Sequence, residues 1–479
     1  MTKLGKQQTS KPYLRVLIFG FVALVAITIL VVEPFDLPNG LSTSAALILL
    51  VVGALATGLI SEQITILIFF LLAMLLAIAS PQVVFSGFYS GAFWLVFGGL
   101  IIGAAVETTG LGDRIARTLI EYISGSYKWV VAAIVLINCI FIFLMPSTLS
   151  RVVLLIPVVT SLSEQMGYSR GSKPANGLVM ATVLTAYLCS TSVLPANVPN
   201  NVLMGASETF LDVRIRYFEY FLLHFPILGL LKAIIIWACV VYLFKPSNPG
   251  TKMPASNVRV LEKTKTKLLQ DEKRILILLM GALMLWATDS VHGITPAWVS
   301  LAFGILCLFP KLGVVSPAEF REKVPMGPLL YVAGIIGIGA VVADSGLGDY
   351  LSKVMIEASN LSPEKPIEGF IVLSSVAMFL SFFSTMPGVP AIMIPLAPDL
   401  QAASGLPLKT VVMTQVVGFS SVWLPYQVPP IIVGMQLAGV PMGVGVKVTS
   451  LIALLSIILL TPLLVLWWQF LGYLPQGGI

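Results

Sequence analysis

Long apolar segments follow one another along this chain of 479 residues, and they leave its backbone few ways to fold. A stretch of about 20 apolar residues crosses the hydrocarbon core of a bilayer as a helix. Inside lipid, only helices and closed barrels satisfy every backbone hydrogen bond. Charged residues make up only 10% of the chain, against roughly 25% in soluble domains. The sequence therefore predicts an all-α polytopic membrane protein.

Eleven segments are long enough to cross the membrane as continuous or broken helices. The first follows a basic tail and ends in VVEPF without a small-residue cleavage site, so we expect an uncleaved first span with a cytoplasmic N-terminus. The long linker 245–273 carries seven Lys or Arg residues and is expected in the cytoplasm. The eleven segments lie near residues 14–33, 42–60, 63–80, 92–109, 176–200, 218–244, 274–290, 295–310, 327–344, 408–430 and 447–470.

Two further apolar regions, 128–163 and 367–403, are each interrupted midway. The interruptions read MPSTLS and STMPGVP. Each region is either a pair of full spans or a re-entrant hairpin that turns back inside the membrane. Non-helical backbone at that depth is tolerated only where protein or a water-filled cavity covers it.

The two halves of the chain resemble each other. GGLIIGAAVETTGLGD (98–113) matches GIIGIGAVVADSGLGD (334–349), and each match precedes an amphipathic stretch, an interrupted region and a span broken by prolines. The unit starts on opposite sides of the membrane in the two halves. Interrupted segments at matching positions of an inverted repeat predict a secondary transporter with its site at the interruptions. The predicted parts are a tail and first span at 1–40, a first repeat at 41–244, the linker at 245–273 and a second repeat at 274–479.

Other kinds of protein find little support in the residues. The chain carries no Ser-His-Asp, HExxH or paired-Cys arrangement, so we expect neither an enzyme nor a cofactor. The four cysteines and two histidines lack the spacing of metal ligands. The net charge of +6 comes from basic residues in loops beside the membrane, so we expect contact with the lipid bilayer and no nucleic-acid partner.

Polar residues at the interruptions are the predicted binding groups. A helix broken in the membrane exposes N–H groups, which attract anions, and C=O groups, which attract cations such as sodium. Hydroxyls beside such a break either bond to a helix carbonyl or bind substrate oxygens. The predicted substrate-binding residues are Ser147, Thr148, Ser150 and Arg151 in the first hairpin, Ser384 and Thr385 in the second, and Asn197, Asn200 and Gln427 in the broken spans. A sodium ion, if used, is expected on Ser147, Ala196, Ser384 and Tyr426.

Arg151 is the most unusual of these residues, because an arginine inside the bilayer costs at least about 2.5–3.5 kcal/mol. No acidic residue near it in the sequence is an obvious partner. Its planar guanidinium suits a carboxylate, sulfate or sulfonate, so an anion contact is predicted. The alternatives are that it caps carbonyls of the hairpin or extends toward the cytoplasm. Lys232, in GLLKAIIIW, is expected to reach the membrane surface or face the helix bundle.

These motifs together resemble the divalent anion/sodium symporter family, which transports sulfate and di- or tricarboxylates. The resemblance covers nearly the whole chain: the repeat, the hairpins ending in LLIP and IMIP, and the broken spans with Pro199-Asn200 and Pro429-Pro430. The family has Ser-Asn-Thr at both hairpin tips. Here Ser147-Thr148-Leu149 and Ser384-Thr385-Met386 lack the asparagine that helps to hold sodium and substrate.

The resemblance implies about 11 transmembrane helices in two inverted repeats, each with a re-entrant hairpin and a discontinuous helix. They would form a scaffold and a transport domain joined by arms near 111–126 and 346–360, in a homodimer that works as an elevator. The predicted function is secondary active transport of small dianions, such as dicarboxylates, sulfate or sulfonates, across the inner membrane, with sodium as the expected coupling ion. The alternatives are sodium-independent anion exchange and a sodium/proton or arsenite-type carrier of a related fold. A non-transporting membrane protein and an anion channel are the other classes considered.

Overall fold

A computed structural model describes residues 12–32, 41–112, 114–115, 126–246, 269–359 and 361–475. Within these ranges the chain forms helices and no strand, which confirms the predicted all-α architecture. Residues 1–11 and 33–40 of the tail and first span, most of the linker 245–273 and most of the first expected arm lie outside the described residues.

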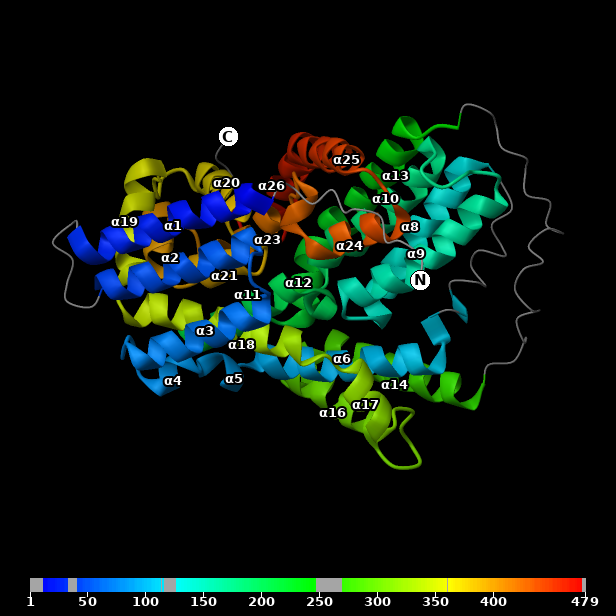
Figure 1. Ribbon diagram of the computed structural model, residues 1–479, viewed down its shortest axis with the longest axis horizontal. Helices are drawn as coiled ribbons and strands as arrows, with labels where there is room; N and C mark the ends of the chain where they lie inside the picture. The colour runs from blue at the N-terminus through cyan, green and yellow to red at the C-terminus, as the bar shows by residue number, and fades with distance from the viewer. Residues whose placement is uncertain are drawn as a thin grey trace.

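Each of the eleven predicted segments contains helix. Where a span begins outside the membrane core, a small polar residue often caps it: Ser61 Oγ accepts a hydrogen bond from the backbone of Ile64, and Ser90 Oγ from Phe93. Figure 1 shows the helices in chain order. The first half contains α1 (Pro12–Val32), α2 (Leu41–Thr57), α3 (Glu62–Leu75), α4 (Pro81–Val84), α5 (Ser86–Tyr89), α6 (Gly91–Thr109), α8 (Tyr127–Leu144), α9 (Thr148–Gln165), α10 (Lys173–Leu188), α11 (Val198–Leu211), α12 (Tyr217–His224), the π-helix η3 (Phe225–Leu231) and α13 (Lys232–Leu243).

The second half repeats much of this order. It contains α14 (Gln270–Ala287), α15 (Asp289–His292), α16 (Pro296–Leu308), α17 (Pro317–Lys323), α18 (Met326–Asp344), α19 (Leu347–Ser359), α20 (Pro366–Phe383), α21 (Gly388–Met393), α22 (Ala397–Ser404), α23 (Leu408–Phe419), α24 (Pro429–Ala438), α25 (Met442–Leu455), the π-helix η5 (Ser456–Leu460) and α26 (Thr461–Phe470).

Six of the described helical stretches are long and apolar enough to cross a membrane: Gly91–Thr109, Tyr127–Leu144, Tyr217–Leu243, Met326–Asp344, Pro366–Phe383 and Met442–Phe470. Shorter apolar helices, including the halves of the broken spans, accompany them. The second halves of the broken spans end later than predicted. The helix α11 ends at Leu211, past the predicted residue 200, and α24 ends at Ala438, past residue 430.

The two hairpins make equivalent contacts with the broken spans. The first hairpin places α9 against α10, the first half of one broken span, and against α24, the second half of the other. The second hairpin places α20 against α23 and α21 against α11, which are the remaining halves. In Figure 1, α9, α10 and α24 accordingly lie on one side of the molecule, and α11, α20 and α21 on the other. Each hairpin thus packs against the first half of its own broken span and the second half of the other.

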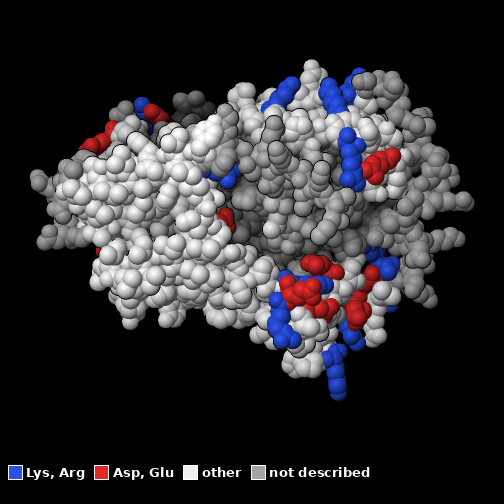
Figure 2. All heavy atoms as spheres, viewed as in Figure 1, with Lys and Arg blue, Asp and Glu red and all other residues white. Residues whose placement is uncertain are grey.

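The helices α6 and α16 form a close pair below this region (Figure 1). Gly98 permits the approach, since a Cβ atom there would lie 2.3 Å from the carbonyl carbon and oxygen of Ser300. Figure 2 shows charged side chains gathered over α14 and α17, at one end of this pair, and few over α3 to α5 on the same face.

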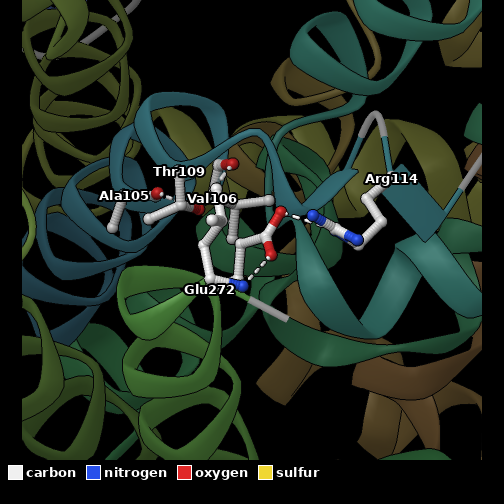
Figure 3. A network of polar contacts seen from close by, with 6 residues as sticks. Ala105, Val106, Thr109, Arg114 and Glu272 are labelled. Atoms are coloured by element: carbon white, nitrogen blue, oxygen red, sulfur yellow. Dashed lines mark hydrogen bonds and ion pairs between the residues drawn. The ribbon is translucent and has the colours of Figure 1, made fainter. Parts of the chain in front are cut away.

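An ion pair joins the two halves of the chain at this charged end (Figure 3). Arg114 Nε, just beyond α6, lies 2.6 Å from Glu272 Oε1 in the first turn of α14. The second carboxylate oxygen accepts a hydrogen bond from the backbone of Leu269 at 2.6 Å. Glu272 is only 3% exposed. Beside it, Lys323 Nζ in α17 donates to Thr108 Oγ1 at 2.9 Å, so the end of α6 is held from two later elements.

Candidate functional site

The two broken spans meet where their first halves end. The helix α10 ends at Leu188 and α23 ends at Phe419. The hydroxyl of Tyr187 donates to the carbonyl oxygen of Phe419 at 3.4 Å, across 232 residues of sequence. The breaks of the two repeats therefore lie side by side inside the protein.

The first break is held open by its own polar residues. After α10 the backbone forms two short 3₁₀ turns, Ser190–Ser192 and Leu194–Ala196, because Pro195 and Pro199 cannot donate to a continuous helix. Asn197 caps α11, accepting from the backbone of Asn200 at 3.1 Å. The Asn200 side-chain nitrogen donates to the carbonyls of Ser190 (3.1 Å) and Val193 (2.8 Å). Asn200 Oδ1 is buried without a hydrogen-bond partner, so it is the part of this side chain available to a ligand.

The second break is held in a related way by Gln427. Its Oε1 accepts from the backbone of Trp423 at 2.9 Å and of Leu424 at 2.8 Å. Its Nε2 donates to Ser381 in α20, at 2.8 Å to the hydroxyl and 3.1 Å to the carbonyl. Tyr426 is 53% exposed, and its hydroxyl donates to the Phe382 carbonyl at 3.3 Å. The second break is thus attached to the first helix of its own hairpin.

The tip of the first hairpin presents the N-terminus of α9. The backbone leaves the helical conformation at Met145 and returns at Thr148. Ser147 Oγ accepts from the Ser150 backbone at 3.2 Å and from the Ser150 hydroxyl at 3.0 Å. This cap leaves other N–H groups of the first turn of α9 without an intrahelical partner, and such groups attract anions.

Arg151 connects this tip to the first break. Its guanidinium is fully buried. One terminal nitrogen donates to the Met145 carbonyl. The other donates to Thr148 Oγ1 (3.0 Å) and to the carbonyls of Ala186 (2.9 Å) and Ala196 (3.1 Å).

These contacts bear on the alternatives raised by the sequence. Because its side chain is wholly buried, Arg151 does not extend to the membrane surface. It caps a hairpin carbonyl and also reaches both sides of the first break. Its Nε is buried with no hydrogen-bond partner, which leaves one donor of the guanidinium free.

The second tip lies between α20 and α21. Ser384 and Thr385 are partly buried there. Gly388 fits closely beneath them, since a Cβ atom at this position would lie 2.1 Å from Ser384 Oγ and 3.4 Å from Thr385 Oγ1. Thr385 Oγ1 lies 2.6 Å from the hydroxyl of Tyr331 in α18, a residue that the sequence motifs did not single out.

Lys232 is a second fully buried cation. It is 1% exposed, and its Nζ donates to the carbonyl and the hydroxyl of Ser420, both at 3.0 Å. Ser420 follows α23 directly, so Lys232 lies at the end of that half-helix, where free carbonyls favour a cation. Lys232 therefore faces the helix bundle, which was one of its two predicted positions. A small cavity of about 70 Å³ lies beside it, lined in part by Ser374, Ser421 and Ser456.

The predicted residues thus gather in two connected groups. Ser147, Thr148, Ser150 and Arg151 adjoin Ala196, Asn197 and Asn200, while Gln427 and Tyr426 attach to the hairpin that carries Ser384 and Thr385. The Ala196 carbonyl oxygen, one of the predicted sodium ligands, accepts a hydrogen bond from Arg151. The positions of Tyr331 and Tyr187 in the site were not foreseen, because an aromatic residue in an apolar span carries no signal of its own in the sequence.

Comparison with known proteins gives consistent results. The family model described as the sodium:sulfate symporter transmembrane region matches residues 15–474. The chain is 24% identical over 357 residues to the L-tartrate/succinate antiporter of Escherichia coli K12, covering 72% of each chain. It is 22% identical over 426 residues to a protein of Cupriavidus necator described only as a membrane protein, covering 84% of this chain and 82% of the relative.

Among solved structures, the YdaH transporter of Alcanivorax borkumensis is similar with a TM-score of 0.49 and 14% identity, covering 90% of this chain and 99% of that one. The family match alone extends over nearly all of the chain. On that match, with the repeated hairpins and broken spans described above, the protein belongs to the sodium:sulfate symporter family of membrane transporters.

Proposed function

We propose that the protein is a secondary active transporter of small dianions, with dicarboxylates as the leading substrate class, in the inner membrane with its N-terminus in the cytoplasm. The observation that supports this most is the buried Arg151, which joins the first hairpin tip to the first break and keeps a free Nε donor. Two helix N-termini, those of α9 and α11, begin beside it. Buried positive charge and free N–H groups together favour an anion.

The substrate class follows from chemistry and from the relatives. A dicarboxylate offers two planar groups that can accept from a guanidinium, hydroxyls and backbone N–H groups. The relatives of Escherichia coli and Shigella are named L-tartrate/succinate antiporters. Sulfate and sulfonates share the same acceptor chemistry and remain alternatives within this proposal, as do the homodimer and the elevator-type movement expected from the resemblance.

For the mode of coupling, we propose sodium-independent exchange in place of the sodium symport that the sequence favoured. In the described part of the chain, neither Arg151 nor Lys232 has an acidic partner. Moving an uncompensated buried charge through the membrane is costly. A bound dianion would offset the charge of Arg151, which lies in the first hairpin, so the loaded transport domain would cross more easily than the empty one. Such a protein exchanges one dianion for another.

The transport proposal is tested by uptake of radiolabelled succinate into proteoliposomes that contain unlabelled succinate. We expect saturable uptake that excess L-tartrate inhibits, and little uptake in liposomes without protein. Sulfate and a sulfonate, added as competitors, rank the substrate classes. Uptake that no competitor reduces, or none above the protein-free control for any of these anions, would contradict the proposal.

A further inference from the structure

Tyr331, in α18, contacts the second hairpin tip. Its hydroxyl lies 2.6 Å from Thr385 Oγ1, and its side chain is 5% exposed. It stands in the second turn of α18, a continuous helix outside both hairpins and both broken spans. The two residues are 54 positions apart in the sequence. Their hydrogen bond links α18 to the second tip.

The surroundings of α18 differ at its two sides. On one side it packs against α3, α4 and α5, which belong to neither the hairpins nor the broken spans. On the other it packs against α11, the second half of the first broken span, and α21, the helix that follows the second tip. Tyr331 therefore lies at the boundary between the elements that carry the site and those that surround it.

The geometry of the tip restricts what Thr385 can do while this contact is made. A threonine hydroxyl has one donor hydrogen and two acceptor positions, and a tyrosine hydroxyl is similar. At 2.6 Å the two oxygens are as close as a hydrogen bond between hydroxyls allows.

We infer that Tyr331 is a positioning residue that holds Thr385 against α18 until an anion replaces it. This inference rests on the proposed function, because it assumes that Thr385 contacts the substrate. Where Thr385 donates its one hydrogen to the Tyr331 oxygen, a dianion has to replace Tyr331 as the acceptor in order to use Thr385. Tyr331 thereby lowers substrate affinity and favours the empty site, which is a useful property in a carrier that has to release its product.

The variant Tyr331→Phe removes only the hydroxyl. We expect purified Tyr331→Phe to bind succinate about fivefold more tightly than the wild type, since a typical hydrogen bond no longer opposes binding. Tyr127→Phe is the matched control. The Tyr127 hydroxyl, at the start of α8, donates to the Pro174 carbonyl in the first turn of α10 at 3.1 Å, and its loss should leave the succinate Kd unchanged.

A second measurement needs no substrate. Apparent melting temperatures of the wild type, Tyr331→Phe, Thr385→Val and the double variant are compared in detergent without any added anion. If the two hydroxyls bond to each other, the double variant should melt no lower than the less stable single variant. Additive losses would overturn the inference, as would a succinate Kd that is unchanged or weaker in Tyr331→Phe. If the wild type fails to bind succinate while the losses are non-additive, the proposed function fails and the Tyr331–Thr385 contact stands.

Discussion

The guanidinium group of Arg151 donates hydrogen bonds to several oxygen atoms that would otherwise attract a cation. Three of its acceptors, the carbonyl of Met145 and those of Ala186 and Ala196, come from the hairpin and from either side of the first break. Unwound carbonyls of this kind coordinate sodium in other secondary transporters. The arginine thus supplies a fixed positive charge at a place where a mobile ion could bind.

Replacing Arg151 with serine should expose these oxygens to a small cation. We expect Arg151→Ser to lose about 3 kcal/mol of stability, because several buried acceptors lose their donor. We also expect sodium, compared with potassium at equal ionic strength, to raise the melting temperature of this variant but not that of the wild type. Arg170→Ser is the control, since Arg170 is exposed and pairs with Glu164 at the surface. Equal melting in the two salts would contradict the interpretation of these oxygens as a cation site.

Gly388 sets the shape of the second tip. In Gly388→Ala the new methyl group would displace the Ser384 hydroxyl, which lies 2.1 Å from the position of a Cβ atom. Because a side chain and not backbone is in the way, we expect a stability loss of only about 1 kcal/mol with at least a tenfold rise in the succinate Kd. Gly443→Ala, with open space around its Cβ position, should change neither. An unaltered Kd in Gly388→Ala would show that the tip does not contact succinate.

Among the elements, the hairpins and broken spans were the ones most accessible from sequence. Prolines next to polar residues inside apolar segments predict interruptions, and the interruptions occur at Met145–Ser147 and Ser384–Pro387. The extent of α11 was harder to predict, because its last residues, MGASETFL, are too polar to count as an apolar span. Contacts between residues far apart in the sequence could not be predicted. Lys232 donates to Ser420 across 188 residues, and no pattern in a single sequence links the two.

The Arg114–Glu272 ion pair joins the end of α6 to the start of α14. Removing the charge of a buried partner leaves the other poorly compensated, which costs about 3 kcal/mol or more. We therefore expect Glu272→Gln to lower the apparent melting temperature clearly, whereas the exposed Glu322→Gln should not. The effect should be similar with and without succinate, as expected of a contact that only holds two helices together. If the Glu272→Gln protein melts at the wild-type temperature, the ion pair does not contribute to the stability of the contact between α6 and α14.

At the scale of the whole molecule, two features act together. The inverted hairpins bring polar tips from opposite directions to a pair of adjacent breaks, and two buried cations without acidic partners in the described chain lie at those breaks. In the function proposed above, the first feature gives a site that either side of the membrane reaches in turn. The second makes the net charge at the site depend on whether a dianion is bound. The proposed exchange of dianions rests on both.

The most direct test of this account measures succinate uptake into proteoliposomes that either contain succinate or are empty, each in sodium and in potassium buffer. The account predicts rapid uptake only when succinate is present inside, at the same rate in the two buffers. Uptake into empty liposomes driven by an inward sodium gradient would contradict it, and would identify the protein as a sodium-coupled symporter.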